Sequence, residues 1–185
     1  MAHRVLGLAR GRPPSLGAGR LVCVDGPAGS GKTTLAAALA DAAGAPVVHM
    51  DDLYPGWDGL PRVTDQLEGL LRPLSAGRAG RYRRYDWHRG AFAEEVEVPP
   101  AELLVLEGVG SGSRVVADLV TVLVWVEAPY DLRMRRGLER DGDAFAPYWH
   151  AWAEAEREHF ATEGTRDRAD LVVDGTGDGP GPATG

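Results

Sequence analysis

The sequence is poor in cysteine, lysine and asparagine. Cys23 is the single cysteine, so no disulfide can form within the chain, which suits a reducing compartment. It lies in the apolar run Leu21–Val24, and we expect a buried, unreactive thiol. Asparagine is absent, and Lys32 is the only lysine among 20 lysine and arginine residues. A lone lysine among so many arginines marks a position where a compact ammonium group is needed.

Long apolar segments are also missing. No run approaches the roughly 20 apolar residues that a membrane-spanning helix needs, and the stretch Val5–Ala9 is too short for the core of a signal peptide. The net charge of −7 argues against a general nucleic-acid binder, because such proteins neutralise phosphates with a broad positive field. We therefore expect a cytoplasmic protein that binds neither membranes nor nucleic acid.

The length of 185 residues and an apolar share of 44% suit one folded domain. Residues 1–19 are rich in Gly, Pro and Arg without periodicity, so we expect a flexible N-terminal arm. Residues 175–185 contain too much Gly and Pro to pack a core and are expected to form a disordered tail. Residues 20–174 would then form the folded domain.

Short β-rich runs alternate with helical patterns in this domain. The runs are continuously apolar, as in strands that are covered on both faces, and strands that alternate with helices pair in parallel. We therefore predict a three-layer α/β fold with a doubly wound parallel sheet of about five strands, which binds ligands at the carboxyl ends of its strands. The expected strands are Leu21–Asp25, Val47–Met50, Leu103–Glu107, Val120–Glu127 and Leu171–Asp174. The expected helices are Lys32–Ala43, Thr64–Leu71, Tyr130–Arg140 and Tyr148–Thr162.

A phosphate-binding motif follows the first expected strand. Residues 26–33 read Gly-Pro-Ala-Gly-Ser-Gly-Lys-Thr, the G-x-x-x-x-G-K-[ST] pattern between a strand and a helix. The glycines let backbone N–H groups point at phosphate oxygens, and the helix N-terminus adds its positive end. Lys32 would contact the β- and γ-phosphates, and the Thr33 hydroxyl would ligate Mg²⁺. The residues predicted to bind ATP here are Gly26, Ala28, Gly29, Ser30, Gly31, Lys32, Thr33 and Thr34.

The missing asparagine bears on the choice of nucleotide. The guanine-specific loops of common GTPases contain Asn-Lys-x-Asp, whereas this chain has no asparagine and its one lysine lies in the phosphate-binding motif. A GTPase of the common kind is therefore disfavoured.

Two carboxylates follow the second expected strand. A carboxylate at this strand end that faces the phosphate-binding motif could accept the proton of an acceptor hydroxyl, and Tyr54 could stack on a planar substrate. Asp51 and Asp52 point to opposite sides, since they are neighbours at a strand end, so the pattern alone does not separate them. His49 is expected to lie in the core or to support another side chain rather than to catalyse.

Charged residues also follow the third and fourth expected strands. Glu107 closes the third strand and could hold Mg²⁺, directly or through water. Arg133, Arg136 and Arg140 share one face of the helix after the fourth strand, because they are three and four residues apart. Arginines on such a face can neutralise the charge of a transferring phosphoryl group. We predict that Asp141–Pro147 is a short lid that excludes water.

The last expected helix carries three large aromatic residues, Trp149, Trp152 and Phe160. We expect them to pack against the rest of the domain. Glu154 and Glu156 are expected to face solvent on the other side.

The two motifs together resemble the uridine kinase group of P-loop kinases, with GPAGSGKTT as the loop and MDDLY where that group has Asp-Ser-Phe-Tyr. On this resemblance Asp51 takes the place of the catalytic aspartate, Tyr54 that of the aromatic residue that contacts the base, and Glu107 matches the Glu-Gly position of the group. The segment DLRMRRGLERD is similar to the arginine-rich helix that enters the lid. The matching residues there are Asp131, Arg133, Arg136, Arg140 and Asp141.

The resemblance covers about half of the chain and implies a kinase that uses ATP and Mg²⁺. It implies that the side chains of Lys32, Asp51, Arg133 and Arg136 take part in phosphoryl transfer, and that Arg140 binds the nucleotide. Thr33 and Glu107 would hold the metal.

The segment 78–89 interleaves arginines with aromatic residues. Such a pattern can stack a base and hold an anion, but the acidity of the chain speaks against nucleic acid. We predict an acceptor pocket in which aromatic rings stack on the acceptor, arginines hold an anion and an aspartate binds a sugar hydroxyl, roughly where uridine kinases have a ribose-binding aspartate. The alternative is a solvated loop. In the predicted pocket, Tyr85 or Trp87 would stack on the acceptor, Arg83 or Arg84 would hold the anion, and Asp86 would bind the sugar hydroxyl.

We therefore expect a monomeric or homodimeric kinase that moves the γ-phosphate of ATP to a hydroxyl of a small molecule, with a nucleoside as the leading acceptor. One alternative is a kinase of a nucleoside monophosphate or another anionic metabolite. The other is an ATP-binding regulator without an acceptor, which would hydrolyse ATP slowly.

Overall fold

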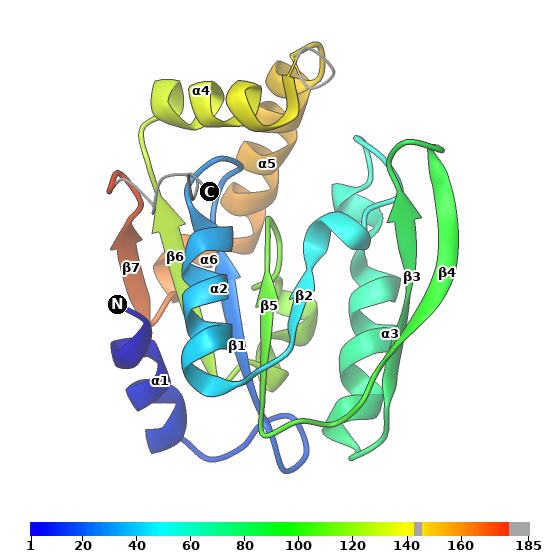
Figure 1. Ribbon diagram of the computed structural model, residues 1–185, viewed down its shortest axis with the longest axis vertical. Helices are drawn as coiled ribbons and strands as arrows, with labels where there is room; N and C mark the ends of the chain where they lie inside the picture. The colour runs from blue at the N-terminus through cyan, green and yellow to red at the C-terminus, as the bar shows by residue number, and fades with distance from the viewer. Residues whose placement is uncertain (143–145, 178–185) are drawn as a thin grey trace, which may run out of the picture.

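A five-stranded parallel sheet forms the centre of the chain, with strand order β2-β5-β1-β6-β7 (Figure 1). This computed structural model describes residues 1–142 and 146–177. β1 lies in the middle and pairs in parallel with β5 and β6. The predicted α/β fold class is confirmed. The strands are β1 (Arg20–Asp25), β2 (Val47–His49), β5 (Leu103–Glu107), β6 (Val122–Glu127) and β7 (Leu171–Asp174).

The two faces of the sheet carry separate cores, because alternate residues of a strand point to opposite faces. On one face, Val22 and Val24 of β1 pack beneath α1 (Ala2–Gly11) and α2 (Lys32–Ala43). On the other face, Leu21 and Cys23 belong to a core shared with α3, the 3-10 helix η3 and α5. This gives the three predicted layers. The bounds of these three elements are Thr64–Ser75, Arg114–Leu119 and Trp149–Glu163.

Cys23 is fully buried in the second of these cores. Burial raises the pKa of its thiol well above the ordinary value, so the thiol stays protonated and unreactive, as predicted.

The N-terminal segment is a helix, so the prediction of a flexible arm is wrong for α1. Val5, Leu6 and Ala9 form one face of the helix and are buried against α2 and the sheet. The following turn is also fixed, since Arg12 pairs with Asp170 at 2.7 Å. The prediction missed these three apolar side chains at helical spacing, because it relied on the high Gly, Pro and Arg content of the segment.

A second correction concerns the arginine-rich segment, which forms an antiparallel hairpin rather than a loop. Its strands are β3 (Gly80–Asp86) and β4 (Ala91–Val98), and the hairpin stands next to α3, beyond the β2 edge of the sheet (Figure 1). Gly80 is required at the contact with α3, because a Cβ there would lie 1.9 Å from the Leu70 carbonyl oxygen. The strands escaped prediction because arginine alternates with tyrosine instead of forming an apolar run.

The remaining helices agree with the predicted ones to within a few residues. α4 (Tyr130–Asp141) follows β6, α5 ends at Glu163 and is capped by Gly164, whose φ is 59°, and the short α6 (Thr165–Arg168) leads to β7. Residues 143–145 of the predicted lid and residues 178–185 of the predicted tail lie outside the described residues. Within the described ranges, no helix has both the length and the apolar character that crossing a membrane requires.

Candidate active site

The loop between β1 and α2 is shaped by its glycines. Gly26, Gly29 and Gly31 have φ angles of 140°, 75° and 100°, which disfavour other residues. A Cβ at Gly26 would lie 2.1 Å from the Val126 carbonyl oxygen. Gly31 precedes α2 and supplies no capping side chain, so the N–H groups of the first helical turn remain available to an anion. The backbone therefore has the loop-and-helix shape on which the predicted phosphate cradle depends.

Lys32 bends back over this loop. Its Nζ donates a hydrogen bond to the Pro27 carbonyl oxygen at 2.9 Å, and 7% of the residue is exposed. Burial lowers the pKa of Lys32, while the carboxylates of Glu107 and Glu156 act in the opposite direction. The ammonium group thus lies inside the loop, where the terminal phosphates of a nucleotide are expected.

The two residues predicted to hold the metal lie next to each other. Thr33 Oγ1 is 3.3 Å from Glu107 Oε1, and only 6% of Glu107 is exposed to solvent. Mg²⁺ prefers such oxygen donors and completes its shell with phosphate oxygens and water. Among the residues that the structure describes, no group of three or more His, Cys, Asp or Glu side chains could hold a metal by itself. The pair therefore fits a Mg²⁺ ion that arrives with a nucleotide.

His49 supports this carboxylate, which is one of the two roles expected for it. Its Nδ1 lies 2.6 Å from Glu107 Oε1. This hydrogen bond is the main reason why the pKa of His49 is raised. The side chain is half exposed, so the alternative of a core position is wrong.

Asp51 lies within electrostatic range of Lys32 in the phosphate loop. It follows β2 in a 3-10 turn, η1 (Met50–Asp52). The residue is accessible to solvent, yet surrounding protein atoms and the Glu107 carboxylate raise its pKa, while the charges of Arg140 and Lys32 oppose the rise.

Asp52 lies in a different environment. Desolvation raises its pKa, and the charges that act on it beyond His49 are Arg84 and Glu94 of the β3–β4 hairpin. The structure thus directs Asp51 towards Lys32 and Asp52 towards the hairpin, a distinction that the sequence pattern left open.

Tyr54 is a core residue. Only 1% of it is exposed, its hydroxyl donates a hydrogen bond to the Val109 carbonyl oxygen, and its ring meets Trp152 edge-on at 5.1 Å. The predicted stacking of Tyr54 on a substrate is therefore wrong for this structure. The resemblance located an aromatic position in the motif but carried no information about its burial.

A cluster of four other aromatic residues lies beside Asp51. It consists of Trp57, Tyr85, Trp87 and Tyr148, and we call it the aromatic cluster. Trp57 stacks on Tyr148 at 4.8 Å and an angle of 6°, and Trp87 contacts both Trp57 and Tyr85. Trp87 Nε1 donates to the Asp51 carbonyl oxygen at 2.8 Å, which ties the hairpin to the candidate base. Tyr85 and Trp87 were predicted at the site; Trp57 and Tyr148 were missed.

The polar residues predicted in the acceptor pocket are engaged within the hairpin. Arg84 forms a two-pronged pair with Glu94 at 2.6 and 3.1 Å, and the Arg83 guanidinium lies 5.0 Å from the centre of the Phe92 ring. Asp86 Oδ1 accepts the backbone N–H groups of His88 and Arg89 at 3.0 and 3.1 Å and so caps the hairpin turn. The predicted contacts of these residues to an anion and to a sugar hydroxyl stay predictions.

The three predicted arginines of α4 have different partners. Arg136 Nη1 donates to the Gly175 carbonyl oxygen at 2.7 Å and lies near Gly31. Arg140 acts electrostatically on Asp51. Arg133 is enclosed, with 11% of its side chain exposed, so its predicted contact with a transferring phosphoryl group is wrong for this structure.

Glu156 was predicted to face solvent, but it is only 2% exposed. Its Oε2 accepts the Ala28 N–H at 2.8 Å, so this N–H of the loop is not directed at a phosphate as predicted. Burial raises the pKa of Glu156, while the Ala28 N–H and Arg133 oppose the rise. The spacing of Trp152, Glu156 and Phe160 at four residues puts them on one helix face, a signal that could have revealed the burial.

Asp25 is another residue that the sequence reasoning missed. It is fully buried at the end of β1, and its carboxylate accepts N–H groups from Gly26, Gly110 and Gly112 at 2.7, 2.9 and 2.8 Å. Burial raises the pKa of Asp25 to about 6 despite these bonds. It fixes the phosphate loop to the segment that follows Glu107. A charged residue that closes an otherwise apolar strand was the available signal.

Comparisons with known proteins show which families and folds this chain resembles. The profile of the phosphoribulokinase/uridine kinase family matches residues 62–144. A candidate uridine kinase from Bacillus stearothermophilus has a similar structure, with a TM-score of 0.60 and 25% identity over 84% of this chain and 89% of that chain. No curated protein matches the sequence.

Two further solved structures support the fold. A candidate fructose transport system kinase from Silicibacter sp. TM1040 has a TM-score of 0.56 and 22% identity over 92% of this chain and 97% of that chain. Shikimate kinase from Bacteroides thetaiotaomicron has a TM-score of 0.50 and 14% identity over 84% of this chain and 87% of that chain. The family match over residues 62–144 and the shared fold show that this chain is similar to the uridine kinase-like P-loop kinases.

Proposed function

We propose that the protein transfers the γ-phosphoryl group of ATP to a hydroxyl of a small, uncharged acceptor of the nucleoside type. The observation that carries this proposal is the convergence of three strand ends. β1 leads into the loop with Lys32, β2 into Asp51, and β5 ends at Glu107. The charges of Lys32 and Glu107 both act on Asp51, so the three groups surround one site.

The reaction would depend mainly on positioning and charge. The Asp51 carboxylate would accept the proton of the acceptor hydroxyl while the hydroxyl oxygen bonds to the γ-phosphorus and ADP leaves. Lys32 and Arg140 would offset the negative charge on the transferring group. Thr33 and Glu107 would hold Mg²⁺, which neutralises the β- and γ-phosphate oxygens when it is bound.

The aromatic cluster supports an acceptor with a flat face. Trp87 lies beside Asp51, and the residue is 36% exposed, so a planar base could rest on its ring while a sugar hydroxyl reaches the carboxylate. The hairpin arginines favour an uncharged acceptor over a phosphorylated one. Arg84 is already neutralised by Glu94, and Arg83 lies over Phe92.

We also infer that the protein works in the cytoplasm as a monomer or homodimer, apart from membranes and nucleic acid. The net charge of −7 and the single, buried cysteine support this inference.

The test is a screen of the purified protein with ATP and Mg²⁺ against nucleosides, nucleotides, sugars and aminoglycoside-like compounds. The release of ADP and the mass of any phosphorylated product are measured together. We expect a nucleoside to yield a monophosphate in step with ADP. Slow ADP release without a phosphorylated product from any acceptor would instead favour an ATP-binding regulator.

A further inference from the structure

One peptide unit of the phosphate loop is held from both sides. The Pro27 carbonyl oxygen accepts a hydrogen bond from Lys32 Nζ at 2.9 Å, and the next N–H, that of Ala28, donates to Glu156 Oε2 at 2.8 Å. The orientation of a peptide plane fixes both groups at once. Glu156 and Lys32 therefore fix together which way this peptide faces, close to where the terminal phosphates are expected.

The same carboxylate also binds Arg133. Glu156 Oε1 lies 2.9 Å from Arg133 Nη1, and Arg133 Nη1 in turn donates to the Ala28 carbonyl oxygen at 3.1 Å. Arg133 Nε donates to the Ala128 carbonyl oxygen at 3.2 Å. Three parts of the chain thus meet at one ion pair: the phosphate loop, α4 and α5.

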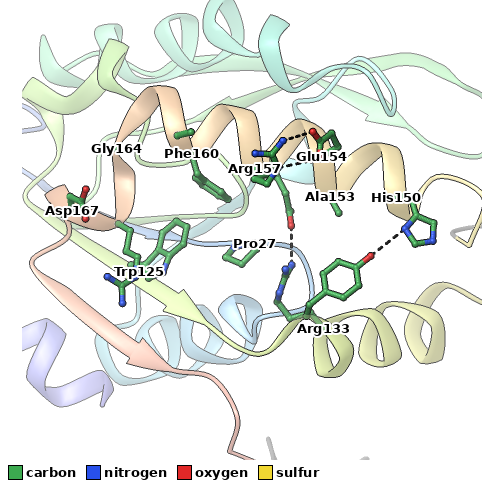
Figure 2. A pocket seen from close by; sticks show the side chains of 14 residues that line it. Pro27, Trp125, Arg133, His150, Ala153, Glu154, Arg157, Phe160, Gly164 and Asp167 are labelled. Carbon is green, nitrogen blue, oxygen red and sulfur yellow. Dashed lines mark hydrogen bonds and ion pairs between the residues drawn. The ribbon is translucent and has the colours of Figure 1, made fainter.

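Figure 2 shows how these parts are arranged. Arg133 reaches from α4 towards α5 beside Pro27, and the dashed line from its guanidinium marks the pair with Glu156. The pair lies in the wall of a pocket of about 700 Å³, whose lining also includes Trp125 and Phe160. The side chains of the pair remain 3% exposed for Glu156 and 11% exposed for Arg133. A pair so withdrawn from water holds its geometry firmly, because separating it would leave a buried charge without a partner.

We propose that Glu156 is a positioning residue for phosphoryl transfer, which couples the phosphate loop to α4 and α5. α4 ends at Asp141 and α5 begins at Trp149, so any movement of one helix relative to the other acts on the Arg133–Glu156 pair. Through the Ala28 N–H, that movement reaches the peptide that faces Lys32. The proposed effect of Glu156 on phosphoryl transfer rests on the proposed kinase function. Its proposed effect on nucleotide binding does not depend on that function.

The experiment compares Glu156→Gln with Glu154→Gln in the full chain. Glutamine keeps the size and an acceptor oxygen but removes the charge that binds Arg133. Glu154 is the matched control, because it lies two residues away on the same helix and pairs with the exposed Arg157. Melting temperature, affinity for ADP and ATP by calorimetry, and kcat and KM for the acceptor are measured for each variant.

For Glu156→Gln we expect a folded protein with about tenfold weaker ADP and ATP binding and about tenfold lower kcat, while KM for the acceptor changes less than threefold. Glu154→Gln should match the parent. A purely structural role predicts a lower melting temperature with unchanged affinity and kcat per folded molecule, and that result would overturn the proposal.

The double variant Glu156→Gln/Arg133→Met tests whether the two side chains act as one unit. The single variants Glu156→Gln and Arg133→Met are measured beside it. We expect the double variant to lose no more nucleotide affinity than the weaker-binding of the two single variants, because the ion pair is already broken in each. Losses that multiply would overturn the proposed coupling. Since calorimetry with ADP needs no acceptor, failure of the kinase assignment would leave this arm of the test intact.

Discussion

The hydroxyl oxygen of Thr33 lies 3.3 Å from Glu107 Oε1, so the first turn of α2 and the end of β5 present oxygen atoms to one point. His49 lies 2.6 Å from the same carboxylate oxygen and fixes its orientation. A metal ion that enters with the nucleotide would meet a preorganised pair of oxygen ligands.

Replacing Glu107 by glutamine should therefore weaken the binding of Mg²⁺. We expect the Mg²⁺ concentration for half-maximal activity to rise about tenfold, the lower end of the effect expected when a metal site loses a charged group. Titration of activity with Mg²⁺ at fixed ATP measures it. His49→Gln should give a smaller shift in the same direction, and an unchanged Mg²⁺ requirement in Glu107→Gln would contradict the assignment of the metal site.

Asp51 and Asp52 should differ sharply on substitution. Asp51→Asn removes the base that faces Lys32 and should lower kcat by about 10²–10⁴-fold, with nucleotide affinity within a few-fold of the parent. Asp52→Asn should keep kcat within about threefold, since Asp52 faces the hairpin. The measurements are steady-state kinetics and ADP calorimetry. If Asp52→Asn were the inactive variant, the two roles would be reversed.

Asp25→Asn should destabilise the fold. The amide nitrogen of asparagine would face the Gly112 N–H or the pair of N–H groups at Oδ1, so at least one buried donor would lose its acceptor. We expect a loss of about 2 kcal/mol in the free energy of unfolding at pH 7, measured by urea denaturation. A variant as stable as the parent would show that these hydrogen bonds contribute little.

The pH dependence of this effect has a definite sign. Burial raises the pKa of folded Asp25 to about 6, above the value of about 3.9 in an unfolded chain. Its contribution to stability is therefore complete below about pH 4 and is lost as the pH rises through 6, by at most about 3 kcal/mol. The parent should exceed Asp25→Asn in stability by more at pH 5 than at pH 7.5. A difference that grows with pH would contradict the raised pKa.

Trp87 should matter for the acceptor and not for ATP. Trp87→Leu removes the exposed ring beside Asp51, and we expect KM for a nucleoside to rise about tenfold, as the loss of stacking with one base would give. The KM for ATP should stay within about twofold. Arg84→Ala is the matched control in the same hairpin. It should leave KM for an uncharged acceptor nearly unchanged, whereas a larger effect of Arg84→Ala than of Trp87→Leu would favour an anionic acceptor.

The fold was largely predictable from the sequence. The central strands are continuous apolar runs, and their alternation with helices specifies a parallel sheet, so β1, β5 and α2 lie where they were expected. The hairpin β3–β4 was not predicted, because its strands carry charged residues on their exposed faces. It is stabilised by packing against α3, and no local sequence pattern shows this contact. The helix α1 was missed for a similar reason, because its small apolar face is stabilised by packing against α2, which the local sequence does not show.

The site was predictable where a motif fixes backbone geometry. Lys32, Thr33 and Glu107 meet as expected, because the phosphate loop and the strand ends share one edge of the sheet. The motif could not say which aromatic residues are exposed. Tyr54 is buried by contacts from α5, and Trp57 takes a place beside Asp51 through the hairpin and Tyr148. These arrangements depend on packing between distant segments.

The central claim is that the ammonium group of Lys32 binds the terminal phosphates of a nucleotide within the loop between β1 and α2. Calorimetric titration of the parent and of Lys32→Ala with ATP and Mg²⁺, after circular dichroism has shown that both are folded, measures this most directly. We expect the variant to bind ATP at least about tenfold more weakly, the loss of one charge-assisted contact. Equal affinity in the two folded proteins would contradict the account.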